Sequence, residues 1–254
     1  MLSALQLRQF AQNGFLILPQ LASPEYCQNV LNLTLQHLSD AIQPMELEAD
    51  TGYPGAPTSI QSEGGQTVRR LLGASMRDTL ISDWATGLAL SAPLHQLLGK
   101  DARLSQAHHN CIMTKQPRFS SITGWHRDSR YWHFERAELI SAWLALGNET
   151  VENGCLMVIP GSHRVDIAST ALDAAQFLRT DLPENQHLLD QAIAVPLRMG
   201  DVLLFSSNLF HAAGKNYTDQ TKFSMVFTYR ASDNLPLPDS RSTSLPELAL
   251  KAHL

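Results

Sequence analysis

The 254-residue chain carries a net charge of −5, with 44% hydrophobic and 17% charged residues, a balance typical of a folded globular protein and not of a disordered one. A chain of this length buries one sizeable core, and its acidic balance offers no basic surface for nucleic acid or for an anionic membrane. No apolar run reaches the roughly 20 residues that span a bilayer, and the first residues lack the pattern of a secretory signal. We therefore expect a single domain over 1–254, with no nucleic-acid or membrane partner.

The first hundred residues are predicted to be a mostly helical lead-in with short extended pieces. Ser3 is a typical N-cap, and Asn13 and Gly14 would end the helix that it begins. The apolar run FLILPQ that follows predicts a short buried strand. Pro24 suits the first turn of a second helix, whose apolar spacing continues towards Ala41.

Residues 45–66 are rich in Gly, Pro, Ser and Thr and are predicted to form a long loop. Such a loop is either a lid over a binding site or a plain surface excursion. Helical periodicity returns over 77–98, where apolar residues recur every four positions. Pro93 is expected to break that run, so that a second short helix follows it.

From about 103 to 232 the chain consists of short apolar or alternating runs separated by turn signals. Asn153 and Gly154 favour a tight turn between antiparallel strands, and Gly200 precedes another strand. Residues 168–191 interrupt this pattern and look mostly helical, as an excursion between strands. The sequence thus predicts a mainly β protein with flanking α, namely an antiparallel barrel or jelly roll with the N-terminal helices packed outside.

A candidate metal site lies within these strands. The segment GWHRD places His126 and Asp128 two residues apart, and residues i and i+2 of a strand point to the same face. A third candidate, His211, ends the segment that begins with the apolar run DVLLF. Two imidazoles and one carboxylate on one face of an iron leave three positions open, as non-haem Fe(II) oxygenases require. On spacing alone, these residues are equally well explained as ordinary structural ones.

Further motifs accompany these residues in order: KQP-x-F at 115–119, AWLAL at 142–146, ENGCLMVIPGSHR at 152–164 and GDVLLF at 200–205. Together, over roughly 105–230, they resemble the phytanoyl-CoA dioxygenase family. The resemblance implies a double-stranded β-helix with Fe(II) held by His126, Asp128 and His211. It also implies O₂ and 2-oxoglutarate as co-substrates, with succinate and CO₂ formed while a C–H bond of a small metabolite is hydroxylated. Hydroxylation is favoured over halogenation, because halogenating relatives carry a small residue in place of Asp128.

The resemblance also implies a basic residue after the second histidine that binds the distal carboxylate of 2-oxoglutarate. The matching position is Lys222, where relatives usually have Arg. A compact ammonium thus replaces a guanidinium that could bind a carboxylate in a bidentate manner. Ser224 shares the strand face of Lys222 and is expected to add a hydroxyl hydrogen bond. The alternative is that Lys222 is a surface charge on an edge strand. Ala213 stands where some relatives have a hydroxyl residue, so one contact is expected to be missing.

Three further cofactor contacts are expected. Trp143 matches an aromatic near the cofactor in relatives, although any barrel core also contains buried tryptophan. Cys111 matches a position that flanks the oxo-acid. Arg70, or its neighbour Arg69, is expected to supply a cation from the helical region.

Substrate contacts are expected from His109, Tyr131 and Trp132, because aromatic side chains commonly line pockets; His109 is equally explained by packing. Ser162 and His163 of PGSHR are adjacent in a turn. Adjacent residues in a turn seldom form a nucleophile–base hydrogen bond, and no G-x-S-x-G elbow is present. This segment is therefore interpreted as a structural turn.

Two other hypotheses stay open from the sequence. A cupin-like dioxygenase would keep the iron without the oxo-acid, in line with the departures at Lys222 and Ala213. A catalytically silent metal- or ligand-binding module would keep only the fold, although three intact ligands speak against it. Cys27, Cys111 and Cys155 form no zinc or redox pair, so a reduced, cytoplasmic compartment is expected. The expected partner is a small-molecule substrate, bound by a monomer or homodimer.

Overall fold

The computed structural model describes residues 1–99 and 101–251. Its helices are α1 Ala4–Asn13, α2 Pro24–Ser39, α3 Ala74–Arg77, α4 Thr79–Ala85, α5 Leu88–Leu98 and α6 Pro183–Leu189. Its strands are β1 Phe15–Leu18, β2 Met45–Leu47, β3 Val68–Leu72, β4 Ala102–Ser105, β5 Cys111–Lys115, β6 Thr123–His126, β7 Leu139–Ala145, β8 Leu156–Val158, β9 Ile193–Val195, β10 Val202–Ser206, β11 His211–Ala213, β12 Lys222–Ala231 and β13 Leu248–Ala249. None of the helices in the described part of the chain is long and apolar enough to cross a membrane.

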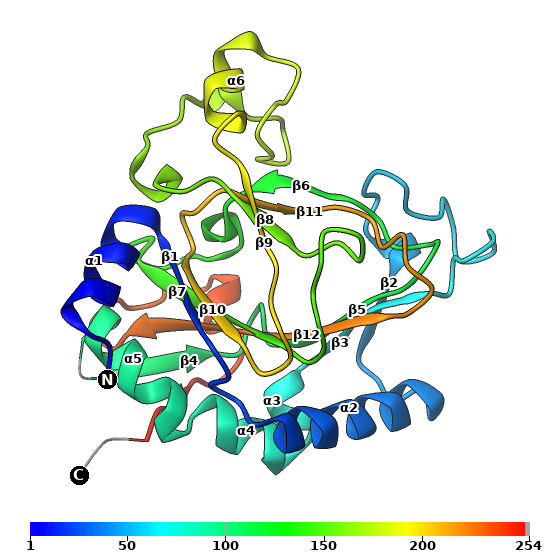
Figure 1. Cartoon of the computed structure of the whole chain (residues 1–254), viewed down its shortest axis with the longest axis horizontal. Coiled ribbons are helices and arrows are strands. Elements are labelled where there is room, and N and C mark those ends of the chain that lie inside the picture. The colour runs from blue at the N-terminus through cyan, green and yellow to red at the C-terminus, as the bar shows by residue number, and fades with distance from the viewer. Residues whose placement is uncertain (100, 252–254) are drawn as a thin grey trace.

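Two antiparallel sheets lie one above the other (Figure 1). The larger has the strand order β1-β10-β7-β12-β5-β3-β2, with β4 pairing β12 and β13 pairing β4. The smaller has the order β6-β11-β8-β9. The expected mainly β architecture with flanking helices is confirmed, although the two sheets stay open and do not close into a barrel.

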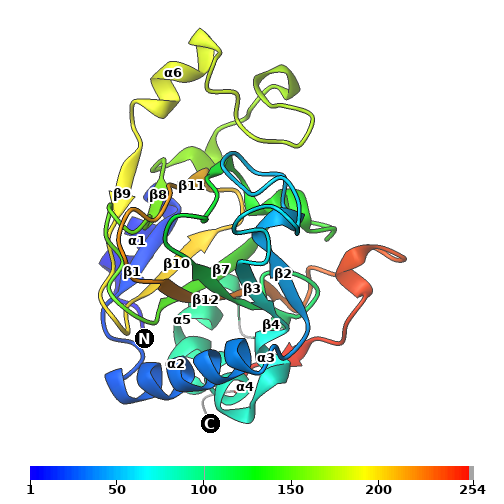
Figure 2. The same cartoon turned by 90° about the vertical axis from the view of Figure 1, so that its right-hand side faces the viewer.

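Helices α2 to α5 cover the face of the larger sheet that points away from the smaller one (Figures 1 and 2). Strand β12 shows why this face is apolar. Successive side chains of a strand point to opposite faces, and Met225, Phe227 and Tyr229 lie in the core shared with the helices. All three are fully buried.

The alternate residues of the same strands face the space between the two sheets. Val226 of β12 packs there with Phe205 of β10 and with Leu156 and Val158 of β8. Lys222 and Ser224 have the parity of Val226 along β12, so the pleat directs them towards the same interior. The cavity described below therefore lies between the sheets, on the side away from the helices.

The expected helix starts are confirmed. The side chain of Ser3 accepts a hydrogen bond from the Gln6 amide, and the Gln6 side chain accepts one from the Ser3 amide. Gly14 ends α1 with φ of 81°, a left-handed conformation that glycine adopts without strain. Pro24 is the first residue of α2, after the N-cap Ser23.

The first hundred residues contribute more strand than the sequence indicated. Strands β1, β2 and β3 all join the larger sheet. Residues 45–47, expected in the long loop, form β2, which pairs β3. The three residues of β2 are all partly buried, and β3 buries Arg69 together with Leu71, so neither strand shows a sustained alternation of hydrophobic residues in the sequence.

Two further expectations were wrong in detail. Pro93 does not break a helix but lies inside α5, and the interruption falls earlier, between α4 and α5. Proline removes one backbone hydrogen bond, but Leu90 and Leu94 on either side of it are fully buried and hold the helix. The excursion over 168–191 is mostly irregular, and its only α-helix is the short α6.

Candidate metal centre and adjoining cavity

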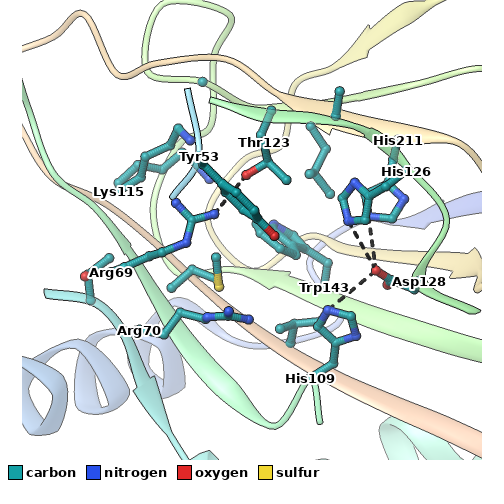
Figure 3. Close-up of a pocket in the computed structure, with 18 of the residues that line it drawn as sticks. Tyr53, Arg69, Arg70, His109, Lys115, Thr123, His126, Asp128, Trp143 and His211 are labelled. Carbon is teal, nitrogen blue, oxygen red and sulfur yellow. Dashed lines mark hydrogen bonds and ion pairs between the residues drawn. The ribbon is translucent and has the colours of Figure 1, made fainter. Parts of the chain in front are cut away.

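Three potential metal ligands converge between the sheets (Figure 3). His126 is the last residue of β6 and His211 the first of β11, and the two are direct partners across these strands. Asp128 does not continue β6 as the strand argument assumed, but begins a 3₁₀ turn, Asp128–Tyr131. Ligand atoms of the three side chains lie within 4.8 Å of one another. All three residues are buried, with 1 to 5% of their surface exposed.

Hydrogen bonds fix the direction of each ligand. Nδ1 of His126 donates to the carbonyl of Gly124 at 2.9 Å, and Nδ1 of His211 donates to that of Leu209 at 3.0 Å. These bonds leave the Nε2 lone pairs free to bind a metal, the arrangement that second-shell contacts usually produce. Ser141 donates to Oδ2 of Asp128 at 3.0 Å.

Oδ1 of Asp128 is buried and has no hydrogen-bond partner among the described residues. It lies 3.6 Å from Nε2 of His126 and 3.4 Å from Nε2 of His211. A buried acceptor without a donor is costly, and a divalent cation among these three atoms would satisfy it. The donor set, two imidazoles and one carboxylate, fits Fe(II).

The charge of Asp128 also suits a cation. Burial would raise the pKa of Asp128, but the nearby imidazoles of His109, His211 and His126 hold it well below its usual range. Burial lowers the pKa of His126, helped by His211. Burial also acts to lower the pKa of His211, but the charge of Asp128 outweighs it and the pKa is raised. Asp128 is therefore an anion at neutral pH.

His109 approaches the same carboxylate. Its Nε2 lies 3.5 Å from Oδ1 of Asp128, and Figure 3 shows it on the other side of the carboxylate from His126 and His211. Its backbone φ of 43° is strained for a residue other than glycine. Burial lowers its pKa to about 4, so it is neutral at pH 7. His109 lines the cavity, as a substrate contact would.

The cavity beside the ligands has an empty volume of about 770 Å³, counting the part open to solvent. Tyr53, from the loop that follows β2, lies on its wall, and the Tyr53 hydroxyl is 3.3 Å from that of Tyr131. The loop after β2 thus reaches the site, and Tyr131 lines the cavity as expected. Trp132 is not on the wall but packs behind it with Phe134 and Leu139.

The expected cofactor residues divide into two groups. Lys222, Trp143 and Arg70 line the cavity. Ser224 and Cys111 do not belong to its wall; Cys111 is buried in the core between the sheets. Ser224 and Lys222 both contact a residue that the sequence did not single out, Glu149.

Glu149 is the centre of a buried polar cluster. Its Oε2 lies 3.0 Å from Nζ of Lys222. Its Oε1 accepts from Nε1 of Trp143 at 2.9 Å and from Oγ of Ser224 at 2.7 Å. Lys222 also donates to Ser224 at 3.0 Å. Lys222 is thus not an edge-strand surface charge.

Other residues of the wall were also not singled out by the sequence. Glu48, which is buried, lies 3.2 Å from Nη1 of Arg69. Thr123, the strand partner of Ala213, accepts a hydrogen bond from Arg69 at 2.9 Å. Lys115 was noted only as the first letter of a motif. Only parity along β5 could have placed Lys115 inside, because it follows Cys111 and Met113 at intervals of two.

The PGSHR segment is structural. Gly161 has φ of 78° and precedes a short 3₁₀ turn, Ser162–Arg164. Ser162 accepts a hydrogen bond from the amide of Phe210 at 2.9 Å, and Nε2 of His163 contacts the carbonyl of Ala11. These side chains tie the turn to the residue before β11 and to α1, and neither lies on the cavity wall.

Comparisons with known proteins agree with this geometry. The sequence model of the family described as phytanoyl-CoA dioxygenase (PhyH) matches residues 10–224. An ectoine dioxygenase of Halomonas elongata is 26% identical over 92% of this chain and 71% of its own length. A probable phytanoyl-CoA dioxygenase of Caenorhabditis elegans is 24% identical over 92% of this chain and 77% of its own length.

Solved structures share the fold. EctD of S. alaskensis in its apoform superimposes with a TM-score of 0.75 at 24% identity, covering 93% of this chain and 79% of that one. The epimerase SnoN, in complex with Fe³⁺, alpha ketoglutarate and nogalamycin RO, gives 0.75 at 21% identity, covering 98% and 94%. The expected double-stranded β-helix architecture is thereby confirmed.

Proposed function

The chain belongs to the phytanoyl-CoA dioxygenase family, and from this premise we propose that it is an Fe(II)- and 2-oxoglutarate-dependent dioxygenase that hydroxylates a C–H bond of a small metabolite. The observation that carries the proposal is the convergence of His126, Asp128 and His211 within 4.8 Å at the edge of a cavity. Two imidazoles and a carboxylate leave half of an octahedral coordination sphere open.

Bound there, Fe(II) would activate O₂, which the hydroxylation of a C–H bond requires. 2-Oxoglutarate would supply two electrons and would be converted to succinate and CO₂. The carboxylate of Asp128 would occupy the ligand position that halogenating relatives leave open, which favours hydroxylation over halogenation. Ser141 holds that carboxylate through Oδ2, so that Oδ1 points to the metal position. The Nδ1 protons of His126 and His211 stay on backbone carbonyls, which keeps both Nε2 atoms available as ligands.

The rest of the cavity wall binds and shields the substrates. Tyr53 and Tyr131 touch through their hydroxyls at 3.3 Å, and the Tyr53 ring meets Phe177 edge-on at 5.6 Å between centroids. This aromatic group lies beside the metal position, since the Phe177 ring is 5.6 Å from that of His126 between centroids, and we infer that it shields that position from bulk water. We infer a substrate small enough to lie between these rings and His109.

The test is an anaerobic titration of metal-free protein with Fe(II) and then with 2-oxoglutarate, followed by visible absorption of the iron–oxo-acid complex. We expect the band in the wild type and its loss in His126→Ala, while Glu138→Gln, a variant of an exposed side chain outside the cavity, keeps it. With O₂ and substrate candidates, succinate should form in proportion to the 2-oxoglutarate consumed. Oxygen consumption without succinate, or iron binding without any band, would overturn the proposal.

A further inference from the structure

Two lysines face each other on the wall of the cavity. Lys222 is the first residue of β12 and Lys115 the last of β5, and they are direct partners across the two strands. Both side chains line the cavity. Like charges directly opposite each other destabilise a sheet, so each ammonium needs compensation.

Lys222 has its compensation inside the protein. Its Nζ lies 3.0 Å from Oε2 of Glu149, and both side chains are almost fully buried, at 3% and 0% exposure. Trp143 and Ser224 satisfy the other carboxylate oxygen of Glu149. The charge of Lys222 is therefore neutralised before any ligand arrives, and a second carboxylate there would meet the negative charge of Glu149.

Lys115 has no such partner. Its Nζ donates to the backbone carbonyl of Ser121 at 3.2 Å, and no carboxylate oxygen of the described residues lies within 4.0 Å of it. Gly154 leaves room for its aliphatic chain, because a Cβ at that position would come within 2.7 Å of Cε of Lys115. Burial, with the charges of Lys222 and Arg69, lowers the pKa of Lys115 to about 7.

Among the described residues of the cavity wall, one basic side chain has no carboxylate partner. The other basic side chains of the wall each have a carboxylate: Arg69 has Glu48 at 3.2 Å, Arg70 has Glu46 at 2.5 Å, and Lys222 has Glu149 at 3.0 Å. Asp128 belongs to the metal position. An oxo-acid with two carboxylates, such as 2-oxoglutarate, would place one of them at the metal. Its second carboxylate would then supply the negative counter-charge that Lys115 lacks within the protein. Figure 3 shows Lys115 across the cavity from His126 and His211, where a ligand extending from the metal would end.

We propose that Lys115 binds the distal carboxylate of the 2-oxo acid co-substrate, while Lys222 and Glu149 form a neutral, internally satisfied pair beside it. This inference rests on the proposed function and replaces the expectation that Lys222 makes the contact. Thr123 also lines this wall; it accepts a hydrogen bond from Arg69, so its own hydroxyl proton stays free for the same carboxylate. This hydroxyl lies opposite Ala213, where the sequence led us to expect a missing contact.

The experiment measures binding, not turnover. Full-length protein loaded with Mn(II) is titrated by calorimetry with 2-oxoglutarate and with 2-oxopentanoate, which has the same carbon chain without the distal carboxylate. In Lys115→Met the dissociation constant for 2-oxoglutarate should rise about 10- to 100-fold, the usual effect of losing a hydrogen bond to a charged group. The constant for 2-oxopentanoate should change less than about twofold.

The double variant Glu149→Gln/Lys222→Met removes the neutral pair as a unit and should weaken 2-oxoglutarate binding far less than Lys115→Met. Lys251→Met is the control for an exposed lysine. The melting temperature of metal-free Lys115→Met should equal or exceed that of the wild type, because the variant removes an ammonium without a carboxylate partner; this result separates lost binding from lost folding.

The outcomes distinguish the two proposals. Wild-type affinity for 2-oxoglutarate in Lys115→Met, equal weakening of both oxo-acids, or a larger loss in the double variant would overturn the role of Lys115 and leave the proposed function standing. A wild-type protein that binds the metal but neither oxo-acid would overturn the proposed function, and the role of Lys115 with it.

Discussion

Glu149→Gln should destabilise the metal-free protein strongly, because it leaves the ammonium of Lys222 buried without a counter-charge. The substitution keeps the size of the side chain and one acceptor oxygen for Trp143 or Ser224. It removes the negative charge 3.0 Å from Nζ of Lys222, at a position where both side chains are at most 3% exposed. Lys115, directly across the strands, adds a second positive charge.

The expected loss follows from that burial. Removing one partner of a buried ion pair typically costs about 3–5 kcal/mol, because the remaining charge stays desolvated. This corresponds to a change of about two to three and a half orders of magnitude in the unfolding equilibrium. Urea denaturation of the metal-free protein, followed by circular dichroism, measures it. Glu149→Gln/Lys222→Met should recover most of the loss, because replacing both partners of a buried pair is often nearly neutral.

Glu138→Gln is the matched control. Glu138 lies 3.0 Å from Arg136, but the two side chains are 71% and 39% exposed. An exposed pair contributes about 0–1 kcal/mol, so this variant should unfold almost like the wild type. If Glu149→Gln costs no more than Glu138→Gln, or if the double variant is as unstable as Glu149→Gln, then Lys222 is not held by Glu149 and the reasoning fails.

Three further predictions follow from the same wall. The pKa of Lys115 is lowered from 10.5 to about 7, so between these pH values the unfolded chain keeps a proton that the folded protein has lost. The free energy of unfolding of the metal-free protein should therefore rise by on the order of a few kcal/mol from pH 7 to about pH 10.5. Lys115→Met should lack this gain in parallel urea titrations. Trp143→Phe should cost about 1–2 kcal/mol through its lost bond to Glu149 without changing Fe(II) affinity; an unchanged unfolding midpoint would contradict this. Tyr53→Ala removes the contacts with Tyr131 and Phe177, so a protease should cut the loop after β2 several-fold faster than in the wild type. Equal cleavage rates would show that Tyr53 does not hold this loop.

Local sequence patterns determined much of the fold and the metal site. The caps at Ser3 and Gly14 depend only on neighbouring residues, so they were predictable. The short apolar strands after residue 103 predicted the β core, because strand periodicity is also local. His126, Asp128 and His211 could be picked out because metal chemistry restricts the residue types. His126 and Asp128 do not share a strand face as predicted, however, since the strand ends at His126.

Contacts between distant segments decided the rest, and local patterns do not encode them. Pro93 could be tolerated in α5 only because the sheet buries Leu90 and Leu94 beside it. Glu149, which follows β7 in a loop, gives no sequence signal of its pairing with Lys222, 73 residues later.

The sequence likewise could not show which of the two lysines is paired with a carboxylate. Parity along β5 and β12 directs Lys115 and Lys222 inward, but only the packed structure shows which ammonium has a carboxylate. The sequence by itself therefore determined the chemistry of the candidate metal ligands, because that chemistry lies in the residue types. Tertiary structure decided which lysine has a carboxylate partner, because charge compensation in a buried site depends on which side chains the fold brings within about 4 Å.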